Sequence, residues 1–289
     1  MPTIADTTIN ATERKDKTTM TKMEYAQAIA DMLPNGMAKE VEKTNGVKLV
    51  GVCFGEGDIR PNVYIDTFYD QGKSVAAAVE EIKRIANNSI APDIDTNAIT
   101  DYAQAKNMLV LRLYNNKTNA EVFKSASEYG FDDLILVPYV QISPEAATKV
   151  TDGLLKVWNV DADAVFADAM ANTKGLGFNI RSMSETMKAL MPEMAWMFPE
   201  VEEGTIEPQY TITIDSKLFG AVGAIIKRNE LMQKFPDGYY VLPSSVHEVI
   251  VMPKVVNTMS KSDLDDMVVS VNEQEVRPEE VLGYKAYEF

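Results

Sequence analysis

The stretch Ala38-Lys-Glu-Val-Glu-Lys-Thr-Asn-Gly-Val-Lys-Leu-Val-Gly-Val-Cys-Phe54 decides the fold class of this chain. At its centre is Asn45-Gly46, a dipeptide that readily adopts the positive φ angles of a tight hairpin turn. Residues 38–44 and 47–54 are therefore expected to pair as antiparallel strands. Cys53, the single cysteine, lies in the second of these strands. We expect it to be a buried, unreactive thiol.

Working outward, residues 20–92 are predicted to form one unit of a helix, three strands and a second helix. Ordered structure should begin near Thr21 with a helix that stops at Pro34-Asn-Gly36. A third strand is expected at 62–68. Ser74 should then open a helix with one apolar face, which is able to cover the sheet. Residues 1–19 are rich in threonine and lack large apolar side chains, which predicts a disordered tail, and Met20 is an alternative start of the chain.

Residues 93–289 are predicted to form a C-terminal α+β part, which either is a second domain or continues the first. Strands are expected at 108–114, 134–142, 210–214, 219–226, 239–242 and 246–252. Helices are expected at 96–105, 119–129 and 229–235, and after the N-caps Thr151, Asp161 and Ser262, with a helical turn from Pro278. An irregular exposed loop is expected at 192–208. The fold class is α+β, with largely antiparallel sheets and flanking helices.

Composition excludes several classes of function. The chain has 289 residues, a net charge of −15 and a pI near 4.6, and its basic residues are not clustered, so we expect no nucleic-acid partner. No apolar stretch approaches the roughly 20 residues that span a bilayer, so we expect no membrane segment. The start of the chain also lacks the apolar core of a signal peptide. These features predict a bacterial-type cytoplasmic protein.

The only histidine suggests the one catalytic alternative. His247 lies in Leu242-Pro-Ser-Ser-Val-His-Glu-Val-Ile-Val-Met-Pro253, close to Ser244, Ser245 and Glu248. A hydrolase could use one of these serines with His247 and an acid such as Glu248 or Asp66. A serine two residues away along a strand is about 6 to 7 Å distant, which is too far for direct proton transfer. We therefore expect His247 to be structural, in a buried strand with no room for a substrate.

Metal and cofactor sites are not expected. The acid pairs Asp66 with Asp70 and Asp93 with Asp95 could bind a hard cation, but accidental pairs are common among 43 acidic residues. One histidine and one cysteine cannot supply a structural zinc site. The glycines at 55–57 and 175–177 match neither the Walker loop nor the dinucleotide fingerprint.

A contact surface is the best hint of function. Met194, Trp196, Met197 and Phe198 form an apolar group within an otherwise acidic loop, and apolar side chains on a loop need cover. With no complete catalytic constellation, we expect a non-enzymatic cytoplasmic protein that binds another macromolecule, with the hydrolase as the alternative.

Four segments together resemble a known family. They are Asn45-Gly-Val-Lys-Leu-Val-Gly51, Tyr64-Ile-Asp-Thr-Phe-Tyr69, the Pro-Ser-Ser-x-His-Glu-Val stretch at 243–249, and the pattern Val-Asn-x-x-x-Val-x-Pro-Glu-Glu-Val-Leu at 271–282. From Met20 to the C-terminus the chain resembles a family of uncharacterised proteins, a domain of unknown function from anaerobic gut bacteria of the Clostridia type. The resemblance implies one coherent architecture and a bacterial cytoplasmic setting, without an activity, cofactor or catalytic residue.

Overall fold

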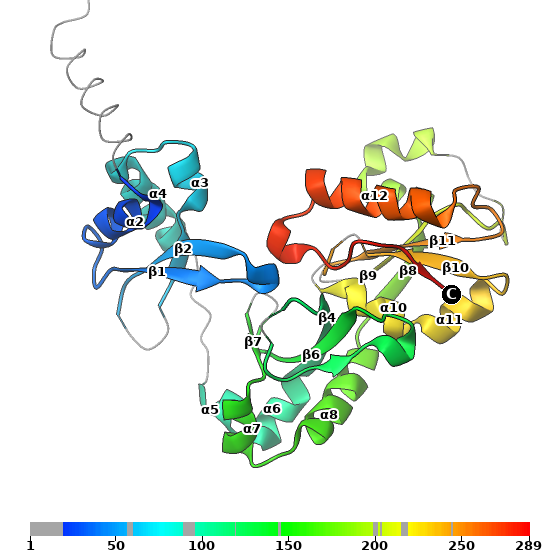
Figure 1. Cartoon of the computed structure of the whole chain (residues 1–289), viewed down its shortest axis with the longest axis horizontal. Helices are drawn as coiled ribbons and strands as arrows, with labels where there is room; N and C mark the ends of the chain where they lie inside the picture. Colours follow the sequence, from blue (N-terminus) through cyan, green and yellow to red (C-terminus); the bar gives the residue numbers. More distant parts are fainter. Residues whose placement is uncertain are drawn as a thin grey trace, which may run out of the picture. The chain divides into compact units, whose positions relative to one another are not determined.

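The structure is a computed structural model that describes residues 20–56, 60–88, 96–118, 120–143, 146–198, 202, 204–214, 219–243 and 245–289. The tail predicted at 1–19, the acids Asp93 and Asp95, and Ser244 lie outside these residues. Contacts divide the chain into two compact units, one up to Asp93 and one from Ile94 (Figure 1). Helices flank three sheets whose strands pair antiparallel, which confirms the predicted α+β class.

The first unit contains the predicted hairpin. Strand β1 (Met37–Glu42) pairs antiparallel with β2 (Lys48–Cys53), and the turn between them holds Asn45 at φ 64° and Gly46 at φ 70°. Helix α2 (Lys22–Ala30) begins in a capping box at Thr21, and α4 (Val75–Asn88) follows Ser74, whose hydroxyl accepts a hydrogen bond from the Ala77 amide. The two helices cover the sheet through a shared core, and Cys53 is buried as expected.

The third predicted strand is only half correct. Strand β3 (Asn62–Tyr64) is short, and helix α3 (Asp66–Asp70) replaces its second half. The Asp66 carboxylate accepts a hydrogen bond from the Val50 amide at 2.9 Å and pairs with Lys22. Ile65 and Phe68, three residues apart, both enter the core. This spacing is that of a helical turn, because strand neighbours alternate between faces.

The second unit begins with a sheet of four strands. Its strands are β4 (Leu109–Asn115), β6 (Leu134–Gln141), β5 (Lys124–Ser125) and β7 (Ala147–Lys149). Helices α7 (Asp152–Trp158) and α8 (Ala162–Lys174) start at Thr151 and Asp161, as predicted, and both caps accept hydrogen bonds from backbone amides. The Thr173 hydroxyl of α8 accepts a hydrogen bond from the Leu111 amide at 2.8 Å, which ties α8 to β4.

Two helix predictions in this region need correction. The helix expected at 119–129 is wrong, since β5 and a 3₁₀ turn (Ser127–Tyr129) occupy it. Val122 and Ala126 are both buried four residues apart, which imitates a helical pattern, but the backbone between them pairs with β6. The helix expected at 96–105 is divided into α5 (Thr96–Thr100) and α6 (Tyr102–Ala105), because the Asp101 side chain caps the second piece.

The second unit also contains a sheet of five strands in the order β12–β10–β11–β9–β8. Helix α12 (Lys261–Gln274) packs its Leu264 and Val268 against one face, and the opposite face joins the main core. Other helical elements of this unit include α9 (Met183–Leu190), α10 (Gly223–Ile226), α11 (Arg228–Lys234) and 3₁₀ turns at Lys106–Met108, Pro192–Met197, Gly220–Val222 and Pro278–Glu280. In the first unit, the hairpin turn at Thr44–Gly46 is also 3₁₀. The strands of the five-stranded sheet are β8 (Phe178–Ser182), β9 (Tyr210–Ile214), β10 (Tyr239–Leu242), β11 (Val249–Pro253) and β12 (Tyr287–Glu288).

Three further predictions here are wrong. The strand expected at 219–226 is helical, because Gly220 and Gly223 bring this segment so close to the backbone of residue 247 and to Ile212 that a Cβ would collide. The strand expected at 246–252 begins only at Val249, as β11, and residues 246–248 form a loop. Helix α12 is capped by Ser260, which forms a capping box with Asp263, and not by Ser262.

Candidate functional site

Helix α9 (Met183–Leu190) begins directly at the end of edge strand β8 and is anchored there by side chains. The Ser182 hydroxyl accepts a hydrogen bond from the Glu185 amide, while the Glu185 carboxylate accepts one from the Ser182 amide. The Thr186 hydroxyl donates to the Ser182 carbonyl and lies 3.0 Å from the Thr211 hydroxyl of β9. The helix is thus fixed at the β8–β9 end of the sheet, where two hollows lie against it.

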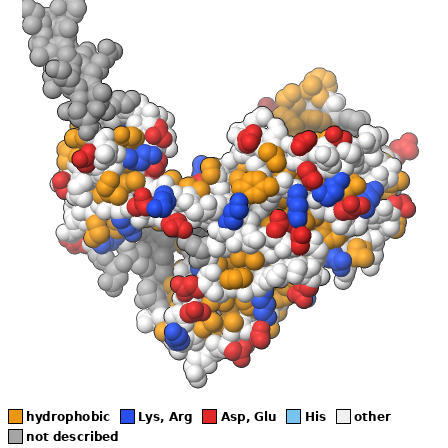
Figure 2. Space-filling view, in the orientation of Figure 1, with side chains coloured by type: hydrophobic (Ala, Val, Ile, Leu, Met, Phe, Trp, Pro, Cys, Tyr) orange, Lys and Arg blue, Asp and Glu red, His pale blue; other side chains and the backbone are white. Residues whose placement is uncertain are grey.

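The end of α9 and the 3₁₀ turn after it (η4, Pro192–Met197) carry an exposed apolar surface, here called the apolar tip. Trp196 is 82% exposed, whereas the other tryptophan, Trp158, is 7% exposed and donates its indole N–H to the Ile99 carbonyl. Figure 2 shows hydrophobic side chains gathered where this light-green segment of Figure 1 ends. The tip consists of Leu190, Met194, Trp196 and Met197.

The sequence identified most of the tip. Met194, Trp196 and Met197 were expected to form a contact surface and are all exposed, while Phe198 is only partly so. Leu190 was missed, because the helix that carries it was not predicted. Five acidic residues occur between positions 193 and 207, and no lysine or arginine occurs between 189 and 216. The tip is therefore apolar within an acidic stretch of sequence.

The histidine pocket is a hollow of about 160 Å³ between α9, the β8–β9 pair and the loop before β11. It contains two of the residues considered for catalysis, His247 and Glu248. The expectation of a buried strand around His247 with no space beside it is therefore wrong. Its lining consists of Arg181, Thr186, Ala189, Leu190, Thr211, Thr213, His247 and Glu248.

The imidazole of His247 is held by the backbone rather than by a serine. Its Nδ1 accepts a hydrogen bond from the Phe219 amide at 3.1 Å, and its Nε2 lies 3.6 Å from Oε1 of Glu280. In this arrangement Nδ1 carries no proton, so the neutral ring bears its proton on Nε2. The Ser245 hydroxyl accepts a hydrogen bond from the backbone amide of His247 at 3.1 Å. Asp66 belongs to the first unit and is bound to Lys22 and Val50.

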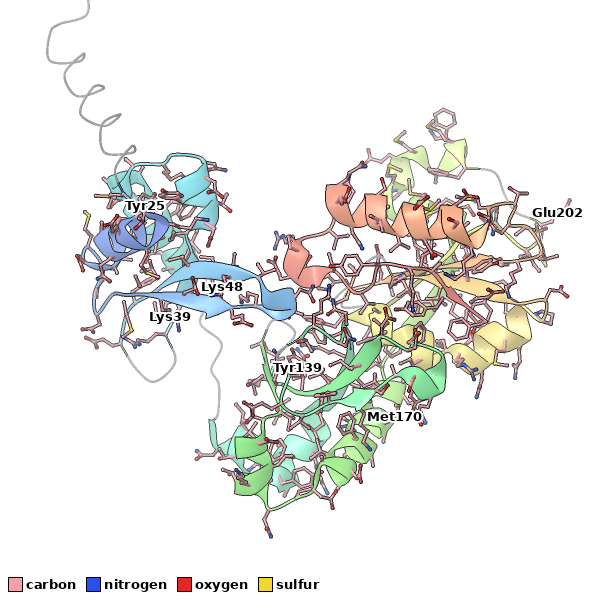
Figure 3. The ribbon with its side chains drawn as sticks, in the orientation of Figure 1. Tyr25, Lys39, Lys48, Tyr139, Met170 and Glu202 are labelled. Atoms are coloured by element: carbon pink, nitrogen blue, oxygen red, sulfur yellow. The ribbon has the colours of Figure 1, made fainter. Side chains whose placement is uncertain are left out.

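Phe219, which binds His247, has an unusual backbone conformation. Its φ of 57° lies in the left-handed region, which costs a bulky residue on the order of 1 to 2 kcal/mol. The Arg112 guanidinium lies 3.4 Å from the centroid of the Phe219 ring and 4.1 Å from that of Tyr139, which Figure 3 labels on β6. Burial lowers the pKa of Arg112, which is only 6% exposed and donates a hydrogen bond to Gln141. Stacking and hydrogen bonding together hold Phe219 against His247.

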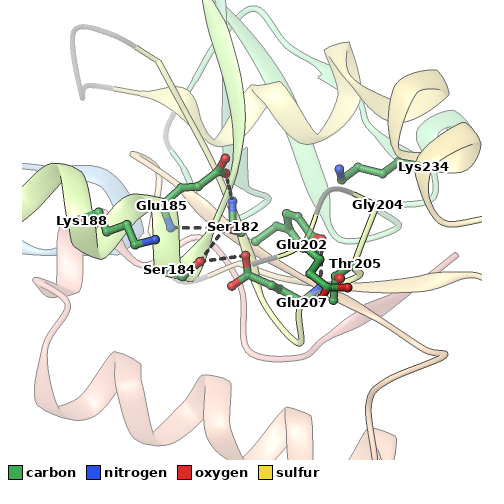
Figure 4. A pocket seen from close by; sticks show the side chains of 10 residues that line it. Ser182, Ser184, Glu185, Lys188, Glu202, Gly204, Thr205, Glu207 and Lys234 are labelled. Atoms are coloured by element: carbon green, nitrogen blue, oxygen red, sulfur yellow. Dashed lines mark hydrogen bonds between the residues drawn. The ribbon is translucent and has the colours of Figure 1, made fainter. Parts of the chain in front are cut away.

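The second hollow beside α9 is larger, about 380 Å³, and polar (Figure 4). The Ser184 hydroxyl donates to the Glu207 carboxylate at 2.8 Å and lies 3.1 Å from the Ser182 hydroxyl. Burial raises the pKa of Glu207, but hydrogen bonds from these two serines outweigh it, so the pKa is lowered overall. Lys188 and Lys234 lie on opposite sides of this hollow.

Neither a cluster of metal ligands nor a membrane-spanning helix occurs among the residues that the structure describes. Within them, no three His, Cys, Asp or Glu side chains are grouped so that they could hold a metal ion. In the same part of the chain, no helix combines the length and the apolar character needed to span a bilayer. The acid pair Asp66 and Asp70 instead binds Lys22, at 2.9 and 3.7 Å.

Comparison with known proteins identifies a family but no function. The model of a family described as "Family of unknown function (DUF5688)" matches residues 22–289. No curated protein and no solved structure matches the chain.

Proposed function

The chain belongs to the DUF5688 family of unknown function, and from its geometry we propose that it is a non-enzymatic protein that binds another protein through its apolar tip. The observation that carries this proposal is the 82% exposure of Trp196 among three further exposed apolar side chains. Tryptophan is enriched among the residues that dominate binding energy at protein interfaces. Burying its side chain contributes on the order of 3 kcal/mol.

The partner's chemistry follows from the surroundings of the tip. The flanking sequence is acidic and has no basic residue between 189 and 216. A partner with an apolar groove bordered by lysine or arginine would complement it, since opposite charges at the rim steer association. The same charge disfavours anionic lipids, nucleic acids and, with a net charge of −15, a second copy of the chain. Cys53, buried and unpaired, suits the reducing cytoplasm as the setting.

Site-specific photocrosslinking tests the proposal. A benzophenone amino acid at position 196 should crosslink one protein in cells of the source organism, and the same group at Val157, which is 62% exposed on α7, should not. Glu193→Lys should reduce the yield at 196, because it reverses a charge beside the tip. Identical products from both positions, or a product with the mass of two copies of the chain, would contradict the proposal.

The hydrolase has less support from the geometry. Nδ1 of His247 is occupied by the Phe219 amide, and the Ser245 hydroxyl bonds to the backbone. A general base needs a nitrogen within hydrogen-bond reach of the nucleophile. Covalent labelling of Ser245 by a fluorophosphonate, lost in His247→Asn, would restore the hydrolase as the better account.

A further inference from the structure

The histidine pocket contains charged and polar groups that have no protein partner among the residues that the structure describes. Arg181 on β8 lies opposite Thr211 on β9, and Thr213, two residues further along, shares the same face of the sheet. The Thr211 hydroxyl bonds to Thr186, but no partner among the described residues satisfies the Thr213 hydroxyl or the Arg181 guanidinium. The pocket therefore has a solvent-exposed cation and a partly buried hydroxyl that have no protein partner among the described residues.

The opposite charge lies in the same pocket. Glu248 also lines it and is exposed to solvent, and within the described part of the chain its carboxylate forms neither an ion pair nor a hydrogen bond. Ala189 and Leu190 of α9 supply an apolar wall. These groups complement a molecule that carries a negative charge for Arg181, a positive charge for Glu248 and an apolar part for the wall.

We propose that the histidine pocket binds a small zwitterion with an aliphatic body, that is, an α-amino acid with a short aliphatic side chain. Its carboxylate pairs with Arg181 and the Thr213 hydroxyl, its ammonium group pairs with Glu248, and its side chain packs on Ala189 and Leu190. The volume of about 160 Å³ suits such a ligand, because a cavity of about 150 Å³ holds a molecule the size of benzene. A simple carboxylic acid fits less well, since it leaves Glu248 unpaired beside its own charge.

This site shares Leu190 with the apolar tip, but Trp196 is not in its lining and Arg181 is not in the tip, so the two proposals are tested at different residues. The site lies on the sheet side of α9, whereas the tip lies at the end of the helix and in the turn that follows. A Trp196 substitution that abolishes partner binding should therefore leave amino-acid binding intact, and Arg181→Gln should leave partner binding intact.

The test uses the full chain and three related probes. L-Valine, isovalerate, which lacks the amino group, and isobutylamine, which lacks the carboxylate, are titrated while NMR follows the methyl groups of Ala189, Leu190 and Thr213. We expect saturable shifts with valine and binding at least about tenfold weaker with either analogue, because each loses one charge-assisted contact.

Single substitutions test which side chain pairs with each charged group of the ligand. Arg181→Gln should weaken valine binding at least about tenfold. Lys188→Gln, which removes the same charge on the polar side of α9, should leave it unchanged. Glu248→Gln should bring isovalerate and valine to similar affinities. The proposal is overturned if valine causes no saturable shift, if isovalerate binds the unaltered chain as tightly as valine, or if Arg181→Gln has no effect.

Discussion

Substituting His247 tests whether its imidazole holds the Phe219 segment in place. His247→Ala removes the acceptor for the Phe219 amide, which then depends on water. An unsatisfied amide costs about 1 to 3 kcal/mol. Because the His247 side chain is 24% exposed and Phe219 can relax from its φ of 57°, we expect the lower part of that range, about 1 to 2 kcal/mol.

Two conservative variants separate the hydrogen bond from simple packing. In His247→Asn, the side-chain oxygen occupies a position close to that of Nδ1, so this variant should retain most of the stability. In His247→Gln, the oxygen lies one bond further out, near the position of Nε2, so this variant should resemble alanine.

Urea unfolding followed by tryptophan fluorescence is the assay. Both tryptophans lie in the second unit, and in a Trp196→Phe background the signal comes from buried Trp158 alone. The free energies of unfolding should rank the unaltered protein first, asparagine close behind, and glutamine and alanine lowest. Equal stabilities for alanine and asparagine would refute the assigned role of Nδ1.

Two further predictions concern the hairpin and the polar hollow. Gly46→Val should destabilise the first unit by about 1 to 2 kcal/mol, because φ is 70° there although no atom lies within 4 Å of the added Cβ. Gly46→Asn should destabilise the unit less than Gly46→Val does. Amide hydrogen exchange of the β1–β2 hairpin should therefore be faster in the valine variant, and equal exchange rates in the two variants would contradict a strained turn at Gly46. Since the pKa of Glu207 is lowered on folding, its contribution is present above the unfolded pKa of about 4.3 and is lost as the pH falls through the lower folded value. At pH 7, the unaltered protein should be more stable than Glu207→Gln by less than about 1 kcal/mol. This difference should vanish on acidification. A difference that is constant with pH would show that an ionised Glu207 does not cause it.

The sequence predicted turns and helix starts well where the backbone conformation depends on neighbouring residues. Asn45-Gly46 set the first turn, and Thr151 and Asp161 marked two helix starts. The segment 219–226 was misjudged because its apolar run suits a strand, while the close approach of Gly220 and Gly223 to distant residues makes it helical. Contacts between residues far apart in the sequence leave no periodic pattern from which they could be predicted.

The candidate site was predictable only in part for the same reason. His247 and Glu248 were considered together because they are adjacent in the segment 242–253. The apolar residues at 194–198 predicted most of the tip. Arg181 and Thr213 could not be associated with them, because strand β8 was not recognised and its pairing with β9 crosses the intervening helix α9. The acceptor role of His247 depends on Phe219, which is 28 residues away.

The central claim, that a partner covers the apolar tip, is tested most directly by hydroxyl-radical footprinting of Trp196. In the purified protein, Trp196 should be oxidised rapidly and Trp158 slowly, in line with exposures of 82% and 7%. In cells of the source organism, we predict that Trp196 becomes protected while Met232, exposed on α11, stays as reactive as in the purified protein. Equal oxidation of Trp196 in both settings would contradict the account.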